Sequence, residues 1–248
     1  MGGRYNLKTT ENLVKILSFV RDGGGTATKT KIRNWLGLSE DDVWAAIGYG
    51  EELNCLRAEG QGYYKFLKDF VIGEEAFYPV VEEAVRSLWA KEGWAQDQYY
   101  IENTARKDSK IVGPWTRPDF TLVSHRKYPW TIGWEFDVVT FEVKRPDNCN
   151  VLAVFEALSH ASTATRAYVV FPIDAEKWSK EYPEQEVRVK DECTRHGIGL
   201  ILIEDVYNKP RPVHVVKAQK REIDHERCSN FLGSVITEKG RQKISMWK

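Results

Sequence analysis

Apolar runs between residues 73 and 205 are the feature that most constrains the fold. Two of them, AYVVF at 167–171 and IGLILI at 198–203, are apolar throughout, which is typical of strands buried on both faces of a sheet. Helical spacing covers 74–91, 150–166 and a polar segment that is broken at Pro183 and ends at His196-Gly197. Three more strands are predicted at 98–104, 119–124 and 134–144. The order helix, three strands, helix, strand, helix, strand predicts an α/β (α+β) domain with a mixed sheet.

The first 70 residues have a different pattern. Apolar residues at helical spacing follow Thr9 to Glu11, and this helix ends at the glycines 23–25. A second helix is predicted at 28–36, and a third begins after Ser39, a favoured N-cap. Two strands then surround a turn at 59–62. Three helices and a hairpin resemble a winged helix-turn-helix, so we predict a smaller domain at 1–70 and a larger one at 71–248 with a helical tail from Asp224.

The third helix of this small domain is acidic, with Glu40, Asp41, Asp42, Glu51 and Glu52 and no basic residue. In a DNA groove it would be repelled by phosphate. Basic residues elsewhere in the domain could contact the DNA backbone instead: Lys29, Lys31, Arg33, Arg57, Lys65 and Lys68. A role in dimerisation or sensing is the alternative to DNA reading.

Composition excludes several classes of protein. The 248 residues contain 36 basic and 36 acidic side chains, so any basic footprint must be local. The four cysteines are far apart, which argues against a zinc site or a disulfide framework. No leader and no apolar run of about 18 residues is present, so we expect a cytoplasmic protein with no membrane partner.

Acidic residues sit on two of the predicted strands. Alternation along 134–144 places Glu142 and Lys144 on one face, and alternation along 119–124 separates Asp119 from Phe120. If the strands are neighbours, two carboxylates and a lysine meet. Such carboxylates repel each other unless a cation lies between them, and this set suits Mg²⁺ or Mn²⁺ acting on a phosphate. The alternative is a surface ion pair; a second acid-x-lysine triplet, Asp108 to Lys110, lies in a predicted loop.

Pro118-Asp119 and Glu142-Val143-Lys144 resemble the two halves of the motif of the PD-(D/E)XK superfamily of restriction-endonuclease-like nucleases, over residues 72–205. The resemblance implies a restriction-endonuclease-like core and a metal-dependent nuclease, an endonuclease rather than an exonuclease. Its substrate would be DNA, in a restriction or defence setting. Asp119, Glu142, the Val143 carbonyl and a helix glutamate would hold Mg²⁺ or Mn²⁺, and Lys144 would stand beside the attacking water. The helix glutamate is expected to be Glu82, with Glu75 as the alternative.

The helix after the motif places Glu156, His160 and Thr163 on one stripe. The stripe resembles the glutamine-tyrosine helix motif of some relatives, although both residue types differ here. His160 is expected either to orient a phosphate or water, or to pair with its own glutamate neighbour.

Basic residues flank the predicted edge, with Trp115 and Trp130 among them. This pattern predicts a groove that tracks phosphates, with solvated loops as the alternative. The residues are Arg106, Lys107, Lys110, Arg117, Arg126, Lys127 and Arg145. A second basic run lies in a segment that Pro210 and Pro212 predict to be an extended arm; it contains Lys209, Arg211, Lys217, Lys220 and Arg221.

Two other functions are compatible with these residues. One is a catalytically silent, nuclease-fold protein or regulator that binds nucleic acid through its winged helix. The other is metal-assisted chemistry on a free nucleotide. A nuclease that cuts both strands needs two sites, which favours a homodimer, and an activating ligand or partner protein is left open.

Overall fold

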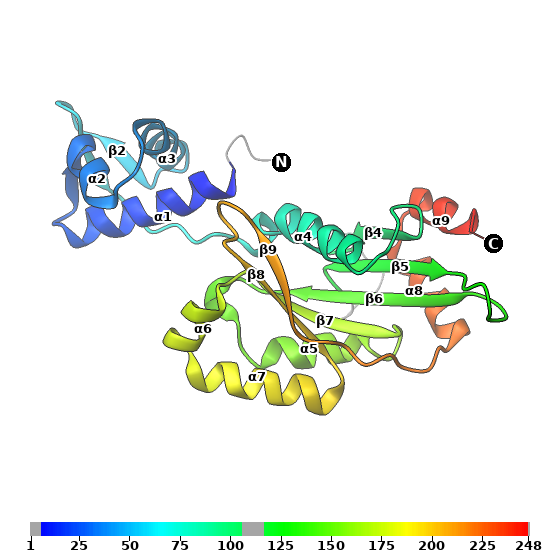
Figure 1. Cartoon of the computed structure of the whole chain (residues 1–248). Helices are drawn as coiled ribbons and strands as arrows, with labels where there is room; N and C mark the ends of the chain where they lie inside the picture. The colour runs from blue at the N-terminus through cyan, green and yellow to red at the C-terminus, as the bar shows by residue number, and fades with distance from the viewer. Residues whose placement is uncertain (1–5, 106–116, 248) are drawn as a thin grey trace. The chain divides into compact units, whose positions relative to one another are not determined.

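The computed structural model describes residues 6–105 and 117–247 (Figure 1). The chain forms two compact units, Met1–Ala76 and Phe77–Lys248, and each is described by itself. The boundary falls close to the one predicted between residues 70 and 71.

The first unit contains three helices and a small antiparallel sheet. Its elements are α1 (Leu7–Asp22), β1 (Thr26–Thr28), α2 (Lys29–Leu36), α3 (Glu40–Glu52), β2 (Leu56–Ala58) and β3 (Tyr63–Phe66). The side chains of Asn6, Thr28 and Ser39 accept hydrogen bonds from main-chain amides in the first turns of the three helices, and so fix where they begin. The sheet order is β1-β3-β2. Strand β1, which the sequence did not predict, is too short for alternation to reveal it.

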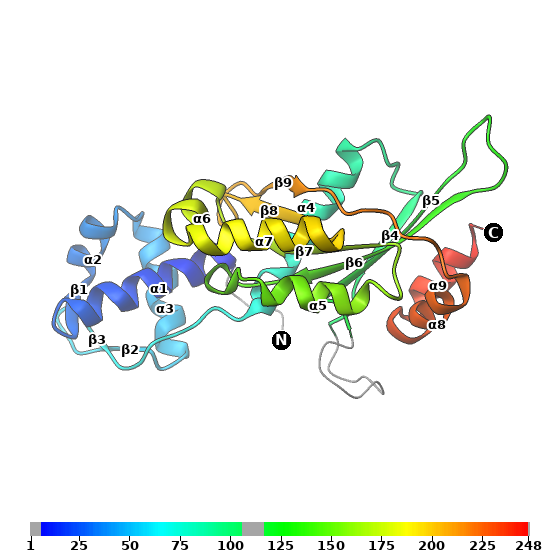
Figure 2. The same cartoon turned by 90° about the horizontal axis from the view of Figure 1, so that it is seen from below.

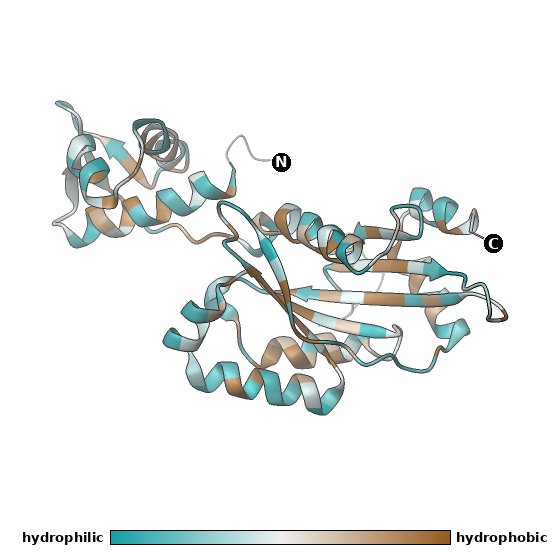
Figure 3. Cartoon of the chain, viewed as in Figure 1, coloured by the Kyte–Doolittle hydropathy of each residue, from teal (hydrophilic) through white to brown (hydrophobic). Residues whose placement is uncertain are grey.

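The second unit is a mixed α/β domain built on a six-stranded sheet of order β4-β5-β6-β7-β8-β9. The strands are β4 (Tyr99–Asn103), β5 (Phe120–Arg126), β6 (Glu135–Val143), β7 (Arg166–Phe171), β8 (Gly199–Glu204) and β9 (Arg211–Val216). Strands β6, β7 and β8 run parallel, and the other neighbours are antiparallel. Figure 3 shows apolar residues concentrated on the central strands, as expected for strands covered on both faces.

Helices cover both faces of this sheet. They are α4 (Tyr78–Lys91), α5 (Leu152–His160), α6 (Ala175–Glu181), α7 (Pro183–His196), α8 (His225–Val235) and α9 (Glu238–Ser245). Figures 1 and 2 show α4 on one face and α5 and α7 on the other. The core beneath α5 and α7 is continuous with β7 and β8 and includes the fully buried Trp178, Phe171 and Val189. No helix in the described ranges has the length and apolarity needed to cross a bilayer.

Three sequence predictions of local structure were wrong. The helix expected at 74–91 begins only at Tyr78, after a short 3-10 turn at Glu74–Ala76, because Pro79 is favoured in a first turn and disfavoured further inside. The helix expected to reach residue 166 ends at His160. The predicted extended arm is partly strand β9, where Pro212 is tolerated because β9 lies at the sheet edge. The tail contains α9 as well as the predicted helix.

Candidate functional site

The predicted acidic residues meet at one end of the β5–β6 pair. Phe120 of β5 lies opposite Phe141 of β6, so the antiparallel register places Asp119 opposite Glu142. Lys144 follows the last residue of β6, and its amide donates to the Val170 carbonyl of β7. The site therefore lies where β5 begins and β6 ends, at the edge reached by the carboxyl ends of the three parallel strands.

Asp119 is held by two hydrogen bonds. The Tyr78 hydroxyl, in the first turn of α4, donates to Oδ1 at 2.5 Å, and the Val143 amide donates to Oδ2 at 2.7 Å. The side chain is 7 % exposed. Both carboxylate oxygens are thus oriented by the protein, which satisfies the requirement that a buried polar group be hydrogen-bonded.

Lys144 joins the strand acid to a helix acid. Its Nζ lies 2.7 Å from Glu142 Oε1 and 2.5 Å from Glu156 Oε2, and the side chains of all three residues are largely buried. Glu156 belongs to α5, so this ammonium connects the sheet to the helix after the motif. Two carboxyls around one lysine make a strongly polar cluster in a poorly solvated place.

His160 is the second α5 residue at the site, one turn after Glu156. Its Nε2 lies 3.7 Å from Glu142 Oε2 and has no hydrogen-bond partner among the described residues. Burial lowers the pKa of His160 to about 4, so the imidazole is neutral at neutral pH. This nitrogen faces the strand glutamate. Thr163 does not share the stripe because the helix has already ended.

Burial also raises the pKa values of the two acids on the strands. Burial, with the added charge of Asp119, raises the pKa of Glu142 to about 9, and a side-chain hydrogen bond with Glu156 favours the protonated form. Burial raises the pKa of Asp119 as well, against the opposing effect of the Tyr78 hydrogen bond. Glu142 is therefore protonated at neutral pH in the absence of a further cation.

The oxygen ligands of these residues are of the kind that a hard divalent cation prefers. The register places Asp119 opposite Glu142, and the charge of Asp119 raises the pKa of Glu142, which is the repulsion that a cation would relieve. Within the described ranges, no group of three or more His, Cys, Asp or Glu residues is arranged as a metal site. Mg²⁺ is commonly held by one or two carboxylates, with water and phosphate completing its coordination.

The predicted helix glutamate, Glu82, is paired within its own helix. Glu82 forms an ion pair with Arg86 at 2.7 Å, one turn further along α4. Glu75, the alternative, is exposed and belongs to the other unit. The α4 residue that does contact the site is Tyr78, which the sequence reading missed. The Tyr-Pro pair at 78–79 is the available signal, because proline in a first turn places Tyr78 at the start of the helix.

Among the predicted basic residues that the structure describes, three of four have hydrogen-bond or ion-pair partners. Arg117 donates to the Ser234 carbonyl, Arg126 donates to the Gly93 carbonyl, and Arg145 pairs with Asp147. Lys127 lies 5.6 Å from the centre of the Trp134 ring. The predictions for Arg106, Lys107, Lys110 and Trp115, and the Asp108 triplet, lie outside the described residues.

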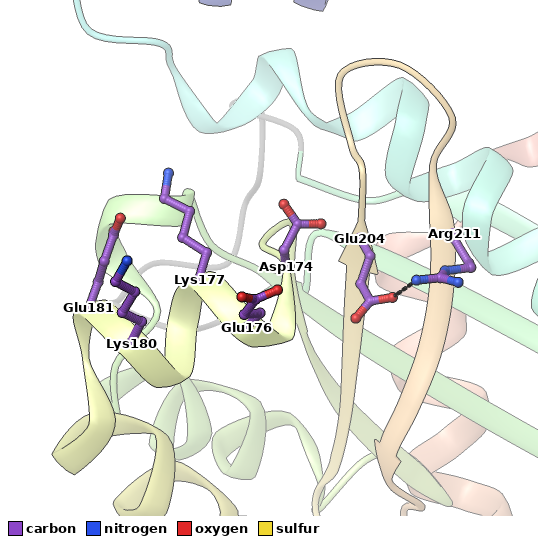
Figure 4. Close-up of a pocket in the computed structure, with 7 residues that line it drawn as sticks. All are labelled: Asp174, Glu176, Lys177, Lys180, Glu181, Glu204 and Arg211. Atoms are coloured by element: carbon purple, nitrogen blue, oxygen red, sulfur yellow. Dashed lines mark hydrogen bonds and ion pairs between the residues drawn. The ribbon is translucent and has the colours of Figure 1, made fainter.

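The second basic run is also largely paired with acids or carbonyls. Arg211 pairs with Glu204, Lys217 with Glu92, and Lys220 with Glu135 and Asp137, while Arg221 donates to the His196 carbonyl. Figure 4 shows Arg211 in a separate pocket beside α6 and the β8–β9 turn. Four acids and three bases line it: Asp174, Glu176, Glu181, Glu204, Lys177, Lys180 and Arg211. The pocket contains none of the candidate site residues and has no excess of positive charge.

No family model matches the chain, and no curated protein matches it. Among solved structures, the chain is similar to the SPO1766 protein of unknown function from Silicibacter pomeroyi. The identity is 12%, the TM-score is 0.39, and the match covers 72% of this chain and 93% of that one.

Proposed function

We propose that the chain is a metal-dependent nuclease of the PD-(D/E)XK type, with a restriction-endonuclease-like core, that hydrolyses phosphodiester bonds in DNA. The observation that carries the proposal is the buried cluster of Asp119, Glu142, Lys144 and Glu156, assembled from two strands and a helix. A buried group of ionisable residues with strongly shifted pKa values is expensive to maintain and is typical of a functional site.

Asp119, Glu142 and the main-chain carbonyl of Val143 would hold Mg²⁺ or Mn²⁺. When bound, such an ion polarises a phosphodiester and lowers the pKa of a bound water. Tyr78 fixes the orientation of Asp119 before any substrate arrives. Lys144 supplies a positive charge beside the reacting phosphate, where charge develops in the transition state. The neutral His160 can accept a hydrogen bond or a proton at Nε2 when the other ring nitrogen carries the hydrogen.

The first unit is proposed to be a winged helix-turn-helix domain. Its order of helix, strand, helix, helix, strand, strand and its three-stranded sheet support this assignment. Helix α3 presents Glu40 and Asp41 at its start, and Lys29 lies over the Trp44 ring at 3.8 Å. Because this acidic helix disfavours a DNA groove, we propose a role in dimerisation or in sensing an activating ligand or partner.

A cleavage assay with matched variants tests the nuclease proposal. Asp119→Asn retains an acceptor for the Val143 amide, and the Tyr78 hydroxyl can accept from the new amide. Glu142→Gln retains an acceptor for Lys144 and presents a donor to His160. Supercoiled plasmid is incubated with each variant and Mg²⁺ or Mn²⁺, and nicked and linear products are measured. Glu83→Gln, at an exposed position on α4, is the control.

We expect each site variant to lose about 10²–10³-fold in rate, and the control and the parent chain to cut equally. Undiminished cutting by Glu142→Gln would refute the assignment. RNA and free nucleotides are assayed beside DNA, and cleavage of the nucleotides alone would favour the small-molecule alternative. Binding of DNA by a parent chain that cuts none of the substrates would favour the catalytically silent alternative.

A further inference from the structure

The loop between β5 and β6, residues 127–134, projects beyond the sheet (Figure 2). Its apolar side chains lie in solvent: Trp130 is 95% exposed and Ile132 is 107% exposed, and Tyr128 and Trp134 are exposed as well. Leaving a large apolar side chain in water forgoes the stabilisation that burial would bring. Four such residues in one short loop, here called the hairpin tip, indicate a contact surface.

Positive charge accompanies these rings. Arg126 and Lys127 lie at the base of the hairpin tip, and no acidic residue occurs from 126 to 134. The Arg126 guanidinium lies 4.1 Å from the centre of the Trp94 ring, and Lys127 lies 5.6 Å from that of Trp134. Glu135, the first acid after the tip, accepts a hydrogen bond from the Tyr128 hydroxyl at 2.8 Å and is paired with Lys220 at 3.2 Å. The surface thus combines aromatic rings with two cations at the base of the tip. The loop contains no acidic residue that would neutralise their charge.

We propose that the hairpin tip binds a polynucleotide, with a base stacked on Trp130 and phosphates contacted by Arg126 and Lys127. Aromatic platforms interleaved with cations are the means by which proteins hold nucleic acid without reading its sequence. This inference deepens the proposed function. It rests on that function only in taking the bound polynucleotide to be the substrate. The same two strands that form this hairpin carry Asp119 and Glu142 at their other end.

Two other occupants fit the charges and shape less well. A second copy of the chain, docked tip to tip, would bring two Arg126-Lys127 pairs together with no acid in either loop. Peripheral membrane binding is usually built on an amphipathic helix with a broad apolar face. The hairpin tip is instead a narrow turn with Thr131 and Gly133 between its apolar residues.

The hairpin sets the distance between tip and site. From Glu135 to Glu142 the strand rises by about 24 Å, at about 3.4 Å per residue. Nucleotides along a B-form strand are also about 3.4 Å apart. At this spacing, a polymer that runs along the hairpin meets the tip about seven nucleotides from the bond at the site, and a tetranucleotide centred on that bond is too short to reach Trp130.

Binding is measured with the whole chain carrying Glu142→Gln, without divalent metal, so that cutting does not enter. Fluorescence anisotropy follows labelled 20-mers with bases, abasic 20-mers of equal charge, and tetranucleotides. Trp130→Ala is compared with Val187→Ala, an exposed apolar control on α7. Loss of one stacked base predicts about 5- to 150-fold weaker binding of the normal 20-mer by Trp130→Ala. The abasic strand, the tetranucleotide and the control variant should show no change.

Equal affinity of Trp130→Ala and its parent for the 20-mer would overturn the proposal, as would an equal loss on the abasic strand. So would a requirement for Trp130 only in binding phosphatidylserine vesicles, or in self-association measured by sedimentation. Thermal melting verifies that each variant is folded, and Trp130 is too exposed to affect stability strongly. The nuclease proposal is tested in a separate experiment and fails if Asp119→Asn still cuts DNA. That outcome would not change the result of the anisotropy measurement.

Discussion

Replacing Lys144 with methionine should destabilise the fold in a way that depends on pH. The ammonium lies between Glu142 and Glu156, and methionine keeps much of the volume without the charge. Glu142 is already protonated at neutral pH, because its pKa is raised to about 9. Glu156 is then the buried carboxylate that loses its counter-ion, and breaking such a pair typically costs about 3–5 kcal/mol.

The variant can limit this cost by protonating Glu156. Each pH unit above an ordinary glutamate pKa of about 4.3 costs about 1.36 kcal/mol, which limits the charge penalty to about 3.7 kcal/mol at pH 7 and about 1 kcal/mol at pH 5. We therefore expect the free energy of unfolding of Lys144→Met to fall by about 3–4 kcal/mol at pH 7 and by about 1 kcal/mol at pH 5. Urea denaturation at both pH values measures the difference.

A second substitution tests the cause. Adding Glu156→Gln to Lys144→Met removes the unpaired charge, so the double variant should recover about 2–3 kcal/mol at pH 7 relative to Lys144→Met. Lys177→Met, at an exposed position on α6, should change stability by no more than about 0.5 kcal/mol. The reasoning is refuted if Lys144→Met loses the same free energy at both pH values, or if the double variant is the less stable of the two.

Three further outcomes are expected. A raised pKa makes Glu142 bind its proton more tightly when folded, so its contribution to stability is present below pH 4.5 and is lost as pH rises toward about 9. His160, with a lowered pKa, instead costs stability as pH falls from 6.5 toward about 4. Urea melts from pH 6.5 to 9 should show a decline that Glu142→Gln reduces, and a slope unchanged by this substitution would contradict it. Mg²⁺ at 100 times its dissociation constant should stabilise the parent by about 2.7 kcal/mol, more at high than at low pH, with no gain in Asp119→Asn in calorimetry. Glu82→Gln should cost about 0.5 kcal/mol or less and retain cutting, because it loses only a surface pair with Arg86; loss of cutting would restore Glu82 to the ligand set.

Periodicity predicted much of the larger unit. Continuous apolar runs located β7 and β8, and alternation located β5 and β6, because burial on a pleated sheet imposes these patterns directly. The register that sets Asp119 opposite Glu142 depends on how two separate strands pair. The sequence could therefore predict that the two acids meet only on the assumption that the strands are neighbours. Strand β9 was missed because Pro210 and Pro212 are turn signals, and only its position at the edge makes Pro212 acceptable.

The sequence predicted which residues come together at the site more fully than it predicted the contacts between them. Glu156 and His160 were placed on the right side of their helix because positions four apart share a face. The link from Glu156 to Lys144 is a tertiary contact and was not foreseen. Glu82 was chosen because the family resemblance implies a glutamate on the first helix, whereas the α4 side chain that contacts Asp119 is the Tyr78 hydroxyl. Thr163 was misplaced because the helix ends before the Ser- and Thr-rich segment that follows it.

The β5–β6 hairpin consists of a paired ladder and a turn, and these two parts differ in how well they tolerate insertions and deletions. Its paired strands lock Asp119 against Glu142, whereas the turn beyond Arg126 lies outside the ladder. Residues inserted into that turn would lengthen its reach while leaving the paired acids where they are. Insertions or deletions in the turn could therefore change what the hairpin tip contacts without moving the paired acids, and an engineer could graft foreign loops there without disturbing the pairing of β5 with β6.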